Sequence, residues 1–95
     1  MGLRLWLIRD NGVPVSNVDF LVWPAEAPAD ARPIFEVETA GAGEALLWVK
    51  PGRYRVGFDR RSWRPELGNP PSRTITIPSL VPDGGVVDLV IQLRP

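Results

Sequence analysis

Short runs in which every second side chain is apolar dominate this sequence, and they constrain its fold more than any other feature. Residues 3–8 read Leu-Arg-Leu-Trp-Leu-Ile, so three leucines share one face of an extended segment. Such period-two spacing is typical of a β-strand with one face in a core. The run ends at Asp10-Asn11-Gly12, where Asn-Gly favours a tight turn.

The same pattern, interrupted by Gly, Pro and Asn, predicts seven strands. They cover residues 3–8, 18–23, 34–39, 44–50, 53–59, 73–77 and 86–93. Pro51 and Gly52 fit the central positions of a type II turn between two of them. Two segments, at about 24–33 and 60–72, contain three prolines each and are expected to be irregular loops. No stretch shows helical spacing.

Seven short strands in 95 residues predict an all-β protein, a two-sheet Ig-like or prealbumin-like β-sandwich. The chain length predicts one domain over residues 1–95. A β-barrel remains the alternative architecture, because periodicity does not separate the two.

The composition contains neither histidine nor cysteine. Acid–base catalysis near neutral pH, nucleophile activation and most transition-metal sites depend on those side chains, and a disulfide framework needs cysteine. We therefore expect no enzyme activity, no cofactor and no metal site.

Charge and hydropathy argue against two further classes of partner. Eleven basic residues balance eleven acidic ones, which gives no net field toward nucleic acid or an anionic membrane. No apolar run approaches the roughly 20 residues of a spanning helix, and the first ten residues are too alternating for a signal peptide. We expect a cytoplasmic product as synthesised, virion-associated if it joins a particle.

Two strings carry a family resemblance. Residues 12–20, Gly-Val-Pro-Val-Ser-Asn-Val-Asp-Phe, are followed by residues 43–56, Gly-Glu-Ala-Leu-Leu-Trp-Val-Lys-Pro-Gly-Arg-Tyr-Arg-Val. Together they resemble the carboxypeptidase regulatory-like or transthyretin-like group of Ig-like sandwiches, over roughly residues 3–59. Tyr54, just after the turn, is expected in the core with its hydroxyl bonded to nearby backbone.

The enzymes of this general architecture need residues that the chain lacks. Hydroxyisourate hydrolases rely on histidines and a C-terminal Tyr-Arg-Gly-Ser motif, and intradiol dioxygenases bind iron through Tyr and His. Here Tyr54 is the only tyrosine and the chain ends Leu93-Arg94-Pro95. The resemblance therefore implies non-catalytic relatives: accessory modules, adhesin stalk repeats and Ig-like pieces of bacteriophage particles.

Outward-facing apolar side chains are the most informative candidate site, because exposed apolar patches and tryptophans mark interaction surfaces. If the alternation holds, the residues that point away from the core are Trp6, Leu21, Trp23, Leu46 and Trp48. Trp23 and Trp48 are the strongest candidates. The structural alternatives are that the long loops fold back over them, or that the inward and outward faces of one strand are reversed.

The segment Arg60-Arg61-Ser62-Trp63-Arg64 combines a tryptophan with arginines. Trp63, Arg61 and Arg64 could bind a partner through cation–π or bidentate contacts. The alternative, which we favour, is a solvated loop whose tryptophan closes one end of the sandwich.

Acidic residues near turns and on outward strand positions are the remaining polar candidates. They are Asp10, Asp19, Asp83, Asp88, Glu36 and Glu38. They could pair or hold Ca²⁺, but solubility and protection of sheet edges are the commoner roles.

These observations favour a non-catalytic module that docks a protein partner, or a further copy of itself, in a larger assembly. A bacteriophage virion, as capsid decoration or a head or tail appendage, is the setting we expect by analogy. The alternative is a carbohydrate- or small-ligand-binding module that uses exposed tryptophan.

Overall fold

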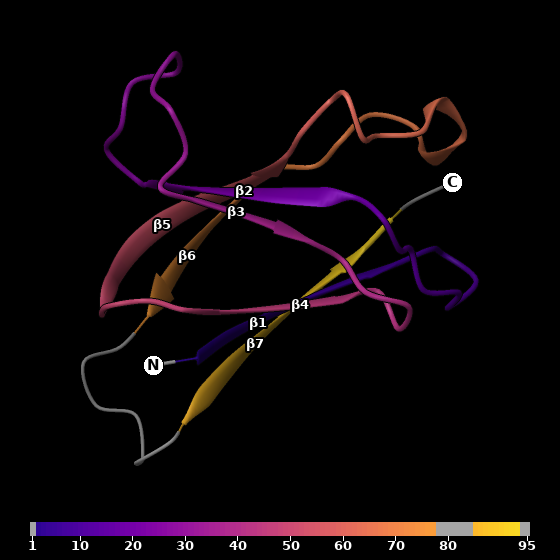
Figure 1. The fold of residues 1–95 in the computed structure, drawn as a ribbon, viewed down its shortest axis with the longest axis horizontal. Helices are drawn as coiled ribbons and strands as arrows, with labels where there is room; N and C mark the ends of the chain where they lie inside the picture. The colour runs from indigo at the N-terminus through magenta and orange to yellow at the C-terminus, as the bar shows by residue number, and fades with distance from the viewer. Residues whose placement is uncertain (1, 78–84, 94–95) are drawn as a thin grey trace.

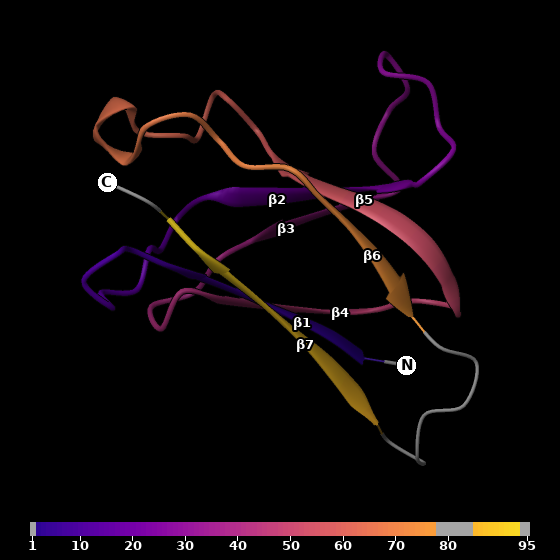
Figure 2. The ribbon, with the colours of Figure 1, turned by 180° about the vertical axis from the view of Figure 1, so that it is seen from behind.

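The computed structural model describes residues 2–77 and 85–93, which form two facing β-sheets (Figures 1 and 2). The strands are β1 (Gly2–Ile8), β2 (Asp19–Pro24), β3 (Phe35–Glu38), β4 (Glu44–Trp48), β5 (Gly52–Phe58), β6 (Arg73–Ile77) and β7 (Val86–Gln92). One sheet has the order β4-β1-β7 and the other β3-β2-β5-β6. The prediction of an all-β, two-sheet sandwich is confirmed, and the barrel alternative is wrong. A single 3₁₀ turn, Pro65–Leu67, interrupts the second long loop.

The two sheets differ in how their strands pair. All pairs of the four-stranded sheet are antiparallel. In the three-stranded sheet β1 pairs antiparallel with β4 but parallel with β7, which joins the two ends of the described chain. Parallel neighbours need a long crossover connection, and the whole four-stranded sheet lies within this one.

Alternating side chains fill the space between the sheets. Leu3, Leu5 and Leu7 are fully buried, as are Val18 and Phe20. Phe20 packs against Phe58 with ring centroids 4.5 Å apart. The inward faces predicted for β1, β2, β4 and β5 are confirmed, because the period of two was read in the correct phase.

The tight turn at Asn11-Gly12 is present, but the two strands that it separates lie in different sheets. The Gly12 N–H donates to the Arg9 carbonyl at 2.9 Å. The chain likewise changes sheet at Pro51-Gly52. Gly52 has a φ of +154°, whereas a type II turn needs about +80°. The predicted type II turn is therefore wrong, and the backbone at Gly52 takes the chain from β4 in one sheet to β5 in the other.

Gly43 shows where backbone packing demands glycine. Its φ is +76°, and a Cβ there would lie 2.5 Å from the Leu7 carbonyl oxygen. The Gly43 carbonyl in turn accepts a hydrogen bond from the Leu7 N–H at 2.8 Å. This contact fixes the start of β4 against the end of β1.

Tyr54 lies at the opposite end of the core. The residue is 9% exposed, and its hydroxyl donates to the Lys50 carbonyl at 2.6 Å. The predicted role of Tyr54 is confirmed. Among the described residues, no helix has the length and apolar character needed to cross a membrane.

Candidate functional site

The outer face of the three-stranded sheet carries an apolar patch formed by Leu46, Trp48 and Val86. The strand register places Trp48 and Val86 on either side of Gly2. A Cβ on Gly2 would lie 3.1 Å from Val86 and 3.5 Å from both Leu46 and Trp48, so the three side chains converge over the bare glycine. Leu46 is 50% exposed and Trp48 61%. The sheet therefore offers continuous apolar surface at one end.

A charged pair lies beside the patch on the same face. The Arg4 Nε donates to Asp88 Oδ1 at 2.8 Å and the Trp6 Nε1 donates to the same oxygen at 3.1 Å. The Arg4 guanidinium also lies 5.5 Å from the centre of the Trp6 ring. The Trp6 hydrogen bond, followed by that of Arg4, holds the pKa of Asp88 below its ordinary value. The Trp6 side chain therefore already has partners on its own sheet, namely Asp88 and Arg4.

Trp48 also borders an apolar groove at the side of the sandwich, between the start of β3 and the end of β4. The groove has a volume of about 420 Å³ and is lined by Ile34, Phe35, Trp48, Val49, Lys50 and Tyr54. Its charged side chain is Lys50, while the Tyr54 hydroxyl already bonds backbone. Trp48 therefore connects the patch with the groove.

Trp23 faces outward from the four-stranded sheet but is covered. Its indole N–H donates to the Ala31 carbonyl at 2.8 Å, and the Arg55 guanidinium lies 5.0 Å from its ring centre. The ring packs on Gly57, whose Cβ would come within 3.3 Å of it. Leu21 on the same face is half-buried. Here the loop folds back over the sheet, as the structural alternative required.

The segment after β5 uses its large side chains to close one end of the sandwich. Trp63 packs on Phe58 with centroids 4.8 Å apart and donates its N–H to the Gly68 carbonyl at 2.7 Å. Arg64 donates to the Ser16 carbonyl at 3.1 Å. Trp63 and Arg64 therefore have internal contacts, and their binding roles stay predictions.

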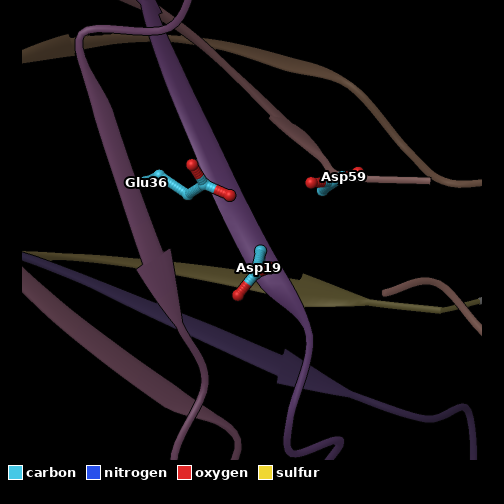
Figure 3. Close-up of side chains that lie close together, drawn as sticks. All are labelled: Asp19, Glu36 and Asp59. Carbon is cyan, nitrogen blue, oxygen red and sulfur yellow. The ribbon is translucent and has the colours of Figure 1, made fainter. Parts of the chain in front are cut away.

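Three carboxylates from neighbouring strands approach one another near this end (Figure 3). Asp19 of β2, Glu36 of β3 and Asp59 after β5 each have an oxygen within 4.8 Å of the others. Arg61 binds Asp59 through its side chain at 2.9 Å and its backbone N–H at 2.9 Å. Its side-chain hydrogen bond is the main cause that lowers the pKa of Asp59. The three carboxylates favour a positive charge nearby, and the Arg61 guanidinium provides it.

Asp19 and Glu36 are among the candidates that the sequence analysis names, but Asp59 is not. Nothing in the spacing of the sequence shows that the residue after β5 lies beside the start of β2. The Asp59 N–H donates to the Asp19 carbonyl at 3.0 Å. The remaining candidates do not join the cluster: Asp10, Glu38 and Asp88 lie elsewhere within residues 2–77 and 85–93. Asp83 lies outside the described residues.

Comparison with known proteins identifies the fold. No protein-family model matches the sequence, and no curated protein does. Among solved structures, BcpA, the major pilin subunit of Bacillus cereus, matches 96% of this chain at 14% identity with a TM-score of 0.68. The chain spans only 27% of that pilin. The fold is a transthyretin-like, Ig-like β-sandwich.

Two further neighbours are similar over nearly their whole length. The 5-hydroxyisourate hydrolase of Klebsiella pneumoniae is 14% identical over 100% of this chain and 93% of its own, with a TM-score of 0.64. The C-terminal domain of the Caf1A usher is 15% identical over 98% and 96%, with a TM-score of 0.56. At such identities the likeness extends to the fold alone.

Proposed function

We propose that this domain is a non-catalytic assembly module that docks a protein partner on the patch of Leu46, Trp48 and Val86. The observation that carries the proposal is the exposure of Trp48, 61%, among the apolar side chains that converge over Gly2. Leaving such side chains in water costs free energy that a partner recovers on binding. Tryptophan is also enriched among the residues that dominate interface energies.

Similar folds give independent support. In the Caf1A usher C-terminal domain, hydrophobic clusters on the surface are important for F1 antigen assembly. Pilin subunits are assembly components by their nature, and BcpA contains a domain of this fold. The present chain combines that fold with an exposed apolar cluster.

The non-catalytic part of the proposal rests on composition. One neighbour of this fold is a hydrolase, and the family resemblance implies that such enzymes need histidines. This chain contains none. Within the described residues the one clustered set of carboxylates, around Asp59, carries an arginine counter-ion.

The test compares capture by three immobilised proteins from extracts of the source organism: the wild type, the double variant Leu46→Ser/Trp48→Ser, and Val13→Ser. Val13 is 49% exposed and follows the far end of β1, so it is a matched control. We expect a partner that wild type and Val13→Ser recover equally and that the patch variant loses about tenfold or more. Equal recovery by all three proteins would refute the proposal.

The identity of the captured partner also tests the setting. A bacteriophage virion remains our sequence-based hypothesis, and the pilin and usher neighbours do not support it. Mass spectrometry of the captured protein separates a virion component from a surface-fibre component.

Sugar binding is the second candidate, favoured by the groove that places Trp48 beside Phe35 and Tyr54. Aromatic rings can stack on sugars, but a specific site also needs a few placed polar groups. A glycan array read with wild type and Trp48→Ala tests this. Saturable binding that the variant loses would favour the groove over protein docking.

A further inference from the structure

The four edge strands of the two sheets are not equally protected against pairing with another chain. β3 has four residues, two of which are Glu36 and Glu38. β4 has five residues and begins with Glu44. β6 also has five residues, begins with Arg73 and exposes two threonines. Short length and charge are the usual protections of an edge. β7 is seven residues long and contains no proline, and its one charge, Asp88, is held by Arg4.

The backbone groups of β7 that face away from β1 can be assigned from the ladder. The Leu93 N–H donates to the Ile8 carbonyl, and the Gly85 carbonyl accepts from the Gly2 N–H. Both polar groups of a strand residue point to the same side, and the side alternates along the strand. Odd-numbered residues of β7 therefore bond β1, and even-numbered ones present their N–H and C=O to the free edge. These are Val86, Asp88, Val90 and Gln92.

Within residues 2–77 and 85–93, no strand pairs with this second edge (Figures 1 and 2). The side chains of the strand are also incompletely covered. Val87 and Leu89 face the core but are only partly buried, and Val90 on the outer face is 57% exposed. An added strand would satisfy the free backbone groups and cover these side chains.

We propose that β7 pairs antiparallel with β7 of a second copy, with Leu89 opposite Leu89 of that copy. In this register Asp88 faces Val90 and Val86 faces Gln92, so all four edge residues of each chain form hydrogen-bonded pairs. Shifting the register so that Asp88 faces Asp88 would oppose like charges, which destabilises a pair of strands. A shift the other way leaves fewer edge residues paired.

The joined strands would form one continuous sheet of six strands with both apolar patches on the same side. Net charge does not oppose the contact, because acidic and basic residues balance. One strand pair buries less than the roughly 800 Å² per partner of a standard interface, so we expect a concentration-dependent dimer. This pairing uses the edge of the sheet and is a contact additional to docking on the patch.

A single introduced cysteine tests the register, because the chain has none of its own. Leu89 would form a non-hydrogen-bonded pair on the dimer axis, where Cα atoms lie about 4.5 Å apart, within the range of a disulfide. We expect Leu89→Cys to give a disulfide-linked dimer under mild oxidation. Val87→Cys should still associate but form no disulfide, because residue 87 faces Ile91 of the second copy. Equal cross-linking of both variants would overturn this register.

Sedimentation velocity over a micromolar to millimolar series tests the edge itself. Val90→Pro removes an N–H from the free edge and leaves the β1 ladder intact, so it should abolish the dimer while circular dichroism stays unchanged. Val90→Asp faces Asp88 and should weaken association about tenfold, whereas Val90→Lys should retain it.

Failure of this inference is distinguishable from failure of the docking function. The Leu46→Ser/Trp48→Ser variant should dimerise like the wild type. A wild type that stays monomeric at millimolar concentration, or a dimer that survives Val90→Pro, would overturn the pairing. A dimer lost in the patch variant would overturn it in favour of face-to-face contact.

Discussion

Trp23 and Trp48 both point outward, one from each sheet, yet they differ in how much of the side chain is exposed to solvent. Trp23 is half-buried, with Ala31 accepting its N–H, Arg55 over its ring and Gly57 beneath it. Trp48 remains 61% exposed. The alternation of the strands is the same in both places, so the difference comes from the loop after β2.

The comparison teaches that the direction of a side chain in a strand does not decide its exposure. The first long loop lies against the outer face of the four-stranded sheet through two hydrogen bonds, from Trp23 to Ala31 and from Arg55 to Ala27. On the three-stranded sheet the apolar side chains converge over Gly2 instead. One face is covered by its own chain, and on the other Leu46 and Trp48 stay exposed.

Replacing each tryptophan with alanine is the strongest way to break this comparison. Trp23→Ala should lower the free energy of unfolding by about 2 kcal/mol, since a half-buried ring, a hydrogen bond and a stacked arginine are lost together. Trp48→Ala should change it by no more than about 0.5 kcal/mol. Urea denaturation of the two variants measures both values. Similar losses would show that Trp48 is structural and would remove the basis of the docking surface.

Alanine at the two glycines beneath these tryptophans sharpens the comparison with a smaller effect. At Gly57 a Cβ would lie 3.3 Å from the Trp23 ring, which the loop holds in place, so Gly57→Ala should cost about 1 kcal/mol. At Gly2 the nearest atom is a Val86 methyl at 3.1 Å. That side chain is only half-buried and no loop among the described residues holds it as the Trp23 ring is held, so Gly2→Ala should stay within about 0.5 kcal/mol. Thermal unfolding of both variants distinguishes a fixed neighbour from a mobile one.

Much of the fold could be predicted because it depends on local spacing. The sequence pattern gives the observed β6 limits of Arg73–Ile77, and Tyr54 makes its expected hydroxyl contact. The division of strands between sheets could not be predicted, since period two carries no information about partners. The parallel pairing of β1 with β7 therefore came only from the structure.

For the candidate site, too, the direction of side chains within a strand could be predicted, but the neighbours from other strands could not. Leu46 and Trp48 point outward as expected, because their strand phase is local. Gly2 and Val86, which complete the patch, belong to strands at the two ends of the chain and needed the register. The cover over Trp23 depends on a proline-containing loop whose path no periodicity describes.

The smallest expected difference concerns the stability of the protein in acid, to which Asp88 of β7 and Asp59 after β5 should contribute unequally. Hydrogen bonds hold the pKa of both carboxyls below the ordinary value, from Trp6 and Arg4 for Asp88 and from Arg61 for Asp59. A lowered folded-state pKa means that the stabilisation is present above the ordinary aspartate value of about 3.9 and is lost as pH falls through the lowered value.

The two contacts differ in what they join. Arg4 and Asp88 are 84 positions apart and connect β1 with β7, so their contact forms only in the folded sheet. Arg61 and Asp59 are two positions apart, and their contact can persist when the sheets separate. We therefore expect Asp88→Asn to flatten the loss of unfolding free energy below about pH 4, and Asp59→Asn to change it less. Urea denaturation at neutral pH and in acid measures both slopes. If Asp59→Asn has the larger effect, the segment after β5 contributes more to global stability than its local contact indicates.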